Sequence, residues 1–185
     1  MPDRYSHLAA RVRVPCGFAM AAIYLFFAEP TPARLVAGSA VALAGLAVRA
    51  ASAGHVQKNR ELAWSGPYAY TRNPLYLGSA IAALGFAIAG GRWWFVMLLA
   101  FFFAAVYFPV MRSEQQHLTA LFGEEYLAYA RAVPLLLPRW KPQRVPGIPP
   151  ARFDPRLYWH NREYEALAAF VVIVLALWGK IVWMG

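Results

Sequence analysis

The sequence predicts an all-α integral membrane protein with five transmembrane helices. Of its 185 residues, 60% are hydrophobic and only 15% are charged, and the mean hydropathy is +0.40. Soluble globular domains are much less apolar and carry more charge. Five apolar runs follow one another, separated by polar or proline-rich stretches, and the basic residues flank these runs. We therefore expect one membrane domain that covers residues 1–185.

The first two spans are predicted at 14–28 and 35–56. A basic segment precedes the first run, as in a signal peptide. We favour a retained anchor, because a chain that is apolar throughout gains little from removal of its first span.

The second run contains small residues at helical spacing and one charge. Gly38, Ala42 and Gly45 would let a neighbouring helix approach closely. We interpret Arg49 mainly as an arginine whose side chain reaches a nearby interface, with a substrate or cofactor contact as the alternative.

The third and fourth spans, 75–89 and 93–111, should form an antiparallel hairpin around the turn at 90–92. Trp93 and Trp94 mark the membrane interface at this turn. The fifth span is predicted at 166–183.

A proline-rich segment, 134–154, separates the fourth and fifth spans. It cannot form a regular helix or strand, because its prolines lack amide donors. We expect it to cross the membrane surface, with Trp140 and Phe153 dipping in.

The basic residues predict the topology. With the N-terminus in the cytoplasm, the cytoplasmic side holds Arg4, Arg11, Arg13, Lys58, Arg60, Arg72, Arg112, Arg131, Arg139, Lys141, Arg144, Arg152, Arg156 and Arg162. The other side holds only Arg34, Arg92 and Lys180. This bias places the polar segment 112–165 in the cytoplasm and the C-terminus on the opposite side.

Several other classes of function are disfavoured. The net charge is +9, but basic residues beside apolar runs indicate contact with anionic lipid headgroups, not with nucleic acid. Cys16 is the single cysteine, so no intramolecular disulfide can form. The four histidines lie at no metal-ligand spacing, and we expect no metal site.

Two polar islands interrupt the apolar pattern. In the first, residues 64–78, Pro67 and Pro74 predict a structured loop over 66–73 that enters a helix near Leu75. The second island, residues 112–129, follows the predicted hairpin. If both lie on the same side of the membrane, they can close over one site.

These islands carry the motifs of a known family. The stretch G-P-Y-A-Y-T-R-N-P-L-Y-L-G resembles the G-x-Y-x-x-x-R-H-P-x-Y-x-G signature of the isoprenylcysteine carboxyl methyltransferase and phospholipid methyltransferase group. The second island, E-Q-Q-H-L-T-A-L-F-G-E-E-Y-L-A-Y, is similar to that group's E-E-x-x-L-x-x-x-F-G-x-x-Y-x-x-Y element. The resemblance covers about residues 49–138.

The resemblance implies S-adenosylmethionine as methyl donor and a lipophilic acceptor that enters from the bilayer. It makes Arg72, Asn73 and Glu114 the expected catalytic residues. The expected cofactor-binding residues are Tyr70, Arg72, Asn73, Pro74, Tyr76, Gly78, Glu114, Gln115, His117, Tyr126 and Tyr129.

Physical chemistry supports several of these roles. A guanidinium such as Arg72 suits a carboxylate as a bidentate partner. Glu114 suits an ammonium or ribose hydroxyls, and Tyr70 and Tyr76 offer ring faces to a sulfonium. Gly78 would allow backbone and ligand to approach closely.

Structural alternatives stand beside each role. Tyr68, Tyr70 and Tyr76 also fit an interfacial aromatic belt, and Arg72 also fits a charge that only sets topology. A further set recurs at helical spacing and is better interpreted as a membrane-facing stripe than as ligand contacts: Leu118, Phe122, Tyr126 and Tyr129. Glu124 and Glu125 follow Gly123 and favour the start of a new helix.

Three positions depart from the family pattern. Asn73 replaces a histidine, Gln115 replaces the second acid of a pair, and Leu135 replaces a basic residue. An amide preserves hydrogen bonding but cannot remove a proton near neutral pH. Two other functions therefore stay open: a degenerate protein that binds a lipid or a partner, and, less favoured, a nicotinamide-dependent membrane reductase.

Overall fold

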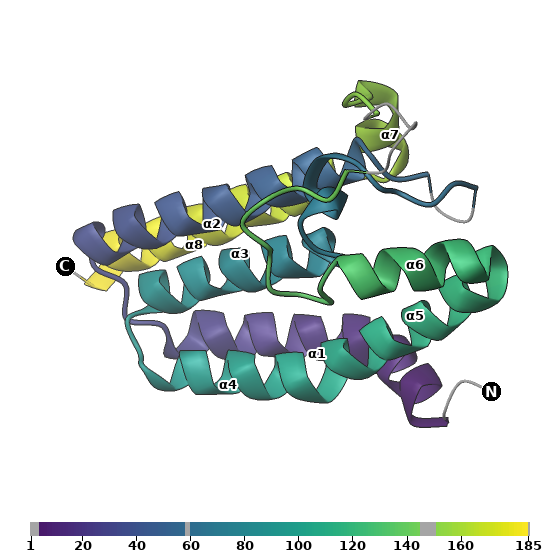
Figure 1. The fold of residues 1–185 in the computed structure, drawn as a ribbon. Coiled ribbons are helices and arrows are strands. Elements are labelled where there is room, and N and C mark those ends of the chain that lie inside the picture. Colours follow the sequence, from purple (N-terminus) through teal and green to yellow (C-terminus); the bar gives the residue numbers. More distant parts are fainter. Residues whose placement is uncertain (1–3, 58–59, 145–150, 185) are drawn as a thin grey trace.

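The computed structural model describes residues 4–57, 60–144 and 151–184, and in this part of the chain it contains helices and no strands. The elements are α1 (Arg4–Phe27), α2 (Pro32–Ala53), the 3₁₀ turn η1 (Gly66–Ala69), α3 (Pro74–Gly90), α4 (Trp94–Phe102), the π-helical turn η2 (Phe103–Tyr107), α5 (Phe108–Phe122), α6 (Glu124–Ala132), α7 (Pro155–His160) and α8 (Tyr164–Met184). Helices α1 to α4 and α8 run alongside one another, and α5, α6 and α7 gather at one end, here called the loop end (Figure 1).

Three described helices are long and apolar enough to cross a membrane: Pro32–Ala53, Trp94–Phe122 and Tyr164–Trp183. Shorter apolar helices, Cys16–Phe27 and Pro74–Gly90, lie at the other two predicted positions. The all-α membrane class is therefore confirmed, and five complete crossings stay a prediction. Helix α1 begins at the loop end and α8 ends at the opposite end (Figure 1).

The closest helix contact joins α2 and α3. The small residues of α2 predicted a close approach by a neighbouring helix, and the structure identifies this helix as α3. A Cβ added at Gly45 would lie 2.4 Å from the amide nitrogen of Ala82, and one added at Gly38 would lie 2.4 Å from the carbonyl oxygen of Gly85. Only glycine allows backbones this close. The pair α2 and α3 packs tightly, and the loop at 66–73, here called the motif loop, leads directly into α3.

The fourth helix does not end where the apolar run ends. Its axis continues from α4 through η2 into α5, so the first half of the second polar island is helical up to Phe122. Gly123, with φ of 55°, separates α5 from α6, and Glu124 and Glu125 occupy the first turn of α6 as predicted. Acidic side chains stabilise a helix N-terminus.

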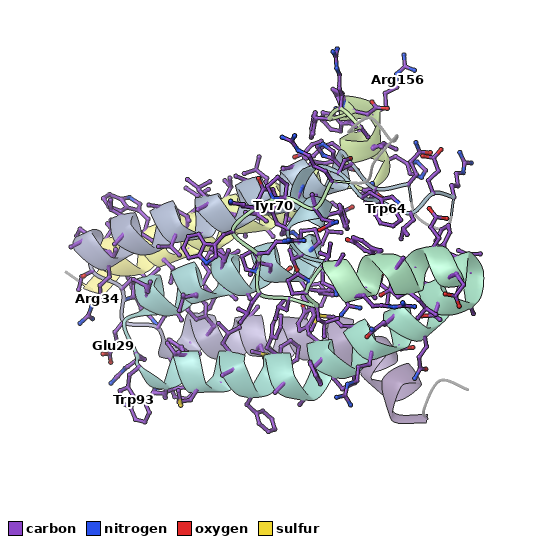
Figure 2. All side chains as sticks on the ribbon, viewed as in Figure 1. Glu29, Arg34, Trp64, Tyr70, Trp93 and Arg156 are labelled. Atoms are coloured by element: carbon purple, nitrogen blue, oxygen red, sulfur yellow. The ribbon has the colours of Figure 1, made fainter. Side chains whose placement is uncertain are left out.

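The opposite end of the bundle is closed by short connections. Gly91, with φ of 73°, ends α3 and confirms the predicted turn between α3 and α4. Glu29 and Arg92 form an ion pair beside it. Trp93 is 78% exposed and points outward at this end (Figure 2).

Helix α8 is attached by polar contacts near both of its ends. The Lys180 ammonium donates to the carbonyl oxygens of Leu25 and Phe26, at 3.1 and 2.8 Å. At the loop end, the Asn161 amide donates to the carbonyl oxygens of Ala53 and Val56, at 3.0 and 3.3 Å. These contacts hold the last helix against α1 and α2.

The proline-rich segment contains no helix over 133–144 and 151–154, as predicted, and residues 145–150 lie outside the described chain. Trp140 is fully exposed. Phe153 packs on His55 and Gly54, so it covers the end of α2 and does not simply dip into lipid. A short helix that the sequence did not predict, α7, follows it.

Candidate functional site

The two polar islands meet at one polar cavity of about 340 Å³ at the loop end. We call it the head cavity. Five of the predicted residues line it: Arg72, Asn73, Pro74, Tyr76 and Glu114. The other lining residues are Arg49, Tyr68, Leu75, Ser79, Tyr107 and Glu163.

Arg72 brings unsatisfied donors to this cavity. Its Nε and Nη1 atoms are buried and have no hydrogen-bond partner among the described residues. A buried donor without a partner costs about 1–3 kcal/mol, more for a charged group. Arg72 thus lines the head cavity and carries two buried donors without a partner.

Glu114 supplies the opposite charge. Its Oε2 atom accepts a hydrogen bond of 3.2 Å from the Tyr76 hydroxyl, which joins α5 to α3. The ring of Tyr76 packs edge-on against Tyr107, with centroids 5.5 Å apart. Tyr107 ends the π-helical turn η2, a feature that often occurs at functional sites.

Arg49 and Glu163 form a third charged group, and they neutralise each other. The Nε and Nη2 atoms of Arg49 donate to the two Glu163 oxygens at 3.0 and 2.7 Å. Arg49 also donates to the Ser79 hydroxyl. Arg49 therefore does not simply reach the interface as we expected. It pairs across the cavity wall, and Arg72 and Glu114 remain as the separated cation and anion.

The motif loop is fixed by the segment 134–144, here called the strap. Main-chain hydrogen bonds join Arg72 N to Pro134 O, Arg139 N to Tyr70 O and Gln143 N to Ala69 O, at 2.9, 3.0 and 2.8 Å. The buried Thr71 hydroxyl donates to Leu136 O at 2.9 Å. These contacts set the backbone position of Arg72.

Asn73 has a structural partner that explains its amide. Its Nδ2 atom donates to the carbonyl oxygen of Leu135 at 2.9 Å. The two departures from the family pattern at these positions thus contact each other, and the side chain of Leu135 is not involved. Asn73 lines the cavity and also holds the strap.

The predicted membrane-facing stripe of Leu118, Phe122, Tyr126 and Tyr129 is wrong, because Leu118 and Phe122 pack against the two buried tyrosines. Tyr126 and Tyr129 are each 2% exposed and pack with Val133 inside the protein, against Leu62 and Trp64. The second island folds back on the first, and α6 therefore turns its aromatic face to the motif loop. Trp64 lies between α6 and α7 at the loop end, and Tyr70 lies nearer the middle of the molecule (Figure 2).

Burial raises the pKa values of the tyrosines in and beside this cluster, so they stay protonated to a higher pH than exposed tyrosines. The Tyr129 hydroxyl donates to Tyr68 O at 2.8 Å. Desolvation raises the pKa of Tyr129 and of Tyr68 well above the ordinary value. Desolvation also raises the pKa of Tyr126, and the nearby Arg72 guanidinium opposes this shift. At neutral pH these three tyrosines are uncharged, and Tyr126 lies close to the Arg72 guanidinium.

The structure places the other predicted residues outside the lining of the head cavity. Gly78 packs against Gly45 and Arg49 in the α2–α3 contact. Tyr70 is 37% exposed and binds the strap through its carbonyl. Gln115 lines a separate hollow with Arg112, and His117 is exposed on α5.

A second, apolar cavity of about 230 Å³ adjoins the first; we call it the tail cavity. It shares Ser79 and Tyr107 with the head cavity. Its other lining residues come from α1, α3, α4, η2 and α8: Gly17, Met20, Ala21, Tyr24, Ala83, Phe86, Ala87, Phe95, Leu98, Leu99, Phe102, Phe103 and Ile173. A polar cavity and an apolar cavity thus lie on either side of two shared wall residues.

Sequence reasoning missed Glu163, Ser79 and Tyr107. Glu163 had a usable signal, because Arg49 inside an apolar run requires a partner and Glu163 stands just before the last span. Ser79 and Tyr107 had none beyond their spacing, since their role depends on how α3 packs against η2.

Comparison with known proteins identifies the family. The family described as phospholipid methyltransferase matches residues 33–125, just over half of the chain. The chain belongs to the phospholipid methyltransferase family. The predicted resemblance is therefore confirmed, and a membrane methyltransferase is the activity that the family supports. No solved structure matches the chain.

The chain is also similar to proteins whose names are not phospholipid methyltransferase. The cobalt-zinc-cadmium resistance protein CzcN of Cupriavidus metallidurans is 35% identical over 45% of this chain and 38% of the relative. The protein-S-isoprenylcysteine O-methyltransferase of Schizosaccharomyces pombe is 30% identical over 54% of this chain and 42% of the relative. The matched part is thus less than half of each relative. Among the described residues, no group of three or more His, Cys, Asp or Glu side chains is placed to hold a metal ion.

Proposed function

We propose that this protein transfers a methyl group from S-adenosylmethionine to a lipophilic acceptor at the cytoplasmic face of the membrane. The observation that carries the proposal is the pair of charges in the head cavity, where Arg72 offers two unpartnered buried donors and Glu114 lines the same cavity. The amino-acid part of the cofactor has one carboxylate and one ammonium, which match these charges. Membership of the family supports the same cofactor.

When bound, S-adenosylmethionine would supply a methyl group on a sulfonium. The acceptor would attack the methyl carbon in line, and the neutral thioether would leave. The acceptor–carbon bond forms as the sulfur–carbon bond breaks, so the main requirement is positioning in a dry pocket. Arg72 would hold the carboxylate, Glu114 the ammonium, and the rings of Tyr76 and Tyr107 would face the sulfonium. Asn73 would keep the loop in place through Leu135.

The lipophilic acceptor is supported by the junction of the two cavities. A reacting group beside Ser79 and Tyr107 can extend an apolar tail among α1, α3 and α4. Among the described residues, no histidine or lysine lines the head cavity. This suits an acceptor that is already anionic, such as a carboxylate or thiolate, because such a group needs no proton removal.

The test is calorimetric titration of S-adenosylmethionine into the full chain in nanodiscs. We expect Arg72→Gln and Glu114→Gln each to weaken binding about tenfold or more, since a hydrogen bond to a charged group contributes about 1.5–3 kcal/mol. Arg112→Gln and Glu124→Gln remove the same charges from exposed positions and should leave binding unchanged. Absence of binding by the natural protein, or equal losses in the control variants, would overturn the proposal.

A further inference from the structure

A second polar pocket lies at the loop end, separate from the head cavity. It measures about 600 Å³ and is formed by the chain after α2, by α7 and by the corner between α7 and α8. We call it the corner pocket. Its lining residues are Gln57, Arg60, Arg156, Leu157, His160, Asn161 and Arg162. Three of them are arginines and none is a carboxylate.

The corner is held in a defined shape. Asn161 is tied to the carbonyl oxygens at the end of α2. Arg162 has φ of 57° and is the one non-glycine residue with positive φ in the described chain. This left-handed conformation turns two successive side chains to different sides, so Arg162 lines the corner pocket and Glu163 pairs with Arg49 in the head cavity.

Among the described residues, the charges in the corner pocket are only partly balanced by other side chains. Arg162 pairs with Glu165, and Asp154 accepts from the main-chain nitrogen of Arg156. Within the described residues, the guanidinium groups of Arg60 and Arg156 form no ion pair. Arg156 points away from the bundle (Figure 2). Like charges gathered in one pocket repel one another, and an anion between them removes this cost.

The pocket also lies next to the start of an apolar helix that is long enough to cross a membrane. The apolar span Tyr164–Trp183 begins two residues after Arg162. Trp159 is 62% exposed and packs against Tyr164, with ring centroids 5.2 Å apart. Aromatic side chains of this kind mark the membrane interface, where the phosphates of lipids are found.

We propose that the corner pocket binds the phosphate group of an anionic membrane lipid, with Arg60 and Arg156 as its main contacts. The ligand is a phosphodiester anion whose acyl chains lie along the start of α8. Occupancy would neutralise the pocket and stabilise the corner that carries Glu163. The site uses no residue of the head cavity, so the proposal stands independently of methyl transfer.

The experiment uses the full chain in nanodiscs of phosphatidylcholine that contain a minor share of phosphatidylglycerol. Native mass spectrometry then counts the phosphatidylglycerol molecules that stay bound. We expect the double variant Arg60→Gln with Arg156→Gln to bind this lipid about tenfold more weakly than the natural protein. The matched control, Arg112→Gln with Arg131→Gln, removes two exposed arginines elsewhere and should bind it normally.

An added arm titrates inorganic phosphate against the bound lipid. Retention of phosphatidylglycerol in excess phosphate supports a lipid site. Displacement of the lipid by phosphate, with phosphate binding lost in the Arg60 and Arg156 double variant, would replace the lipid with a soluble phosphate and overturn the proposal. Equal lipid retention by all three proteins would also overturn it, as would an equal loss in the control.

Discussion

The head cavity and the tail cavity share Ser79 and Tyr107, but the rest of their walls consist of different kinds of side chains. The head cavity is formed by charged side chains on a loop, on α2, on α5 and at the α7–α8 corner, and two donors of Arg72 have no partner among the described residues. The tail cavity is formed by apolar side chains from the interiors of helices. The head cavity thus selects a ligand mainly by its charges, and the tail cavity selects one mainly by the shape of its apolar part. Changes to each cavity should therefore have separable effects.

The largest effect is expected from Arg49→Ala. This change leaves Glu163, whose side chain is only 9% exposed, without its ion-pair partner. Removing one member of a buried pair costs about 3 kcal/mol or more. Thermal unfolding in detergent should show the loss, and the double variant Arg49→Ala with Glu163→Ala should recover part of it. Equal stability of Arg49→Ala and the natural protein would show that the pair does not hold the head cavity together.

A smaller effect is expected when the tail cavity is filled. Ala83→Phe adds a ring to its wall and should displace about three methylene groups of an acceptor tail, or about 2 kcal/mol. The KM for a long-chain acceptor should rise about thirtyfold while calorimetry shows unchanged cofactor binding. Leu84→Phe, an exposed change on the same helix, is the matched control. Loss of cofactor binding in Ala83→Phe would mean that the two cavities are not separable.

Loss of one hydrogen bond between the motif loop and the strap should cost less free energy than either change above. Asn73→Ala removes the hydrogen bond to Leu135 O, and we expect a loss of about 1 kcal/mol in unfolding free energy. Cofactor binding should weaken only to a similar degree, because Arg72 keeps its main-chain bond to Pro134. Asn73→His tests the residue typical of the family. Complete loss of binding in Asn73→Ala would move this residue from a positioning role to direct contact with the cofactor.

The smallest expected effect is the contribution of Tyr129 to the fall in the free energy of unfolding at alkaline pH. Below pH 10, Tyr129 is neutral in both the folded and unfolded states, so it adds no pH dependence. Its pKa is raised in the folded state by burial, so above pH 10 the unfolded chain loses its proton first and stability falls. At half a unit above the ordinary pKa, this amounts to about 0.8 kcal/mol. Unfolding at several pH values should show a shallower alkaline decline for Tyr129→Phe.

Helix positions and the meeting of the two motifs were predictable, because hydropathy and proline placement determine them locally. The α2–α3 contact was also predictable from Gly38, Ala42 and Gly45. The direction of α6 was not, since the spacing of Tyr126 and Tyr129 is the same whether the helix faces lipid or protein. Glu163 was missed because it lies outside the motif region, and its pairing with Arg49 depends on where α8 packs.

The prolines of the strap restrict how it can align with the motif loop. Pro134, Pro138 and Pro142 recur at every fourth position, and the two main-chain donors, Arg139 and Gln143, each follow a proline directly. The prolines therefore occupy positions whose amide is not needed. A slip by one residue toward the N-terminus would put a proline at each donor position and abolish both bonds. The missing amides thus exclude a slip of the strap in this direction.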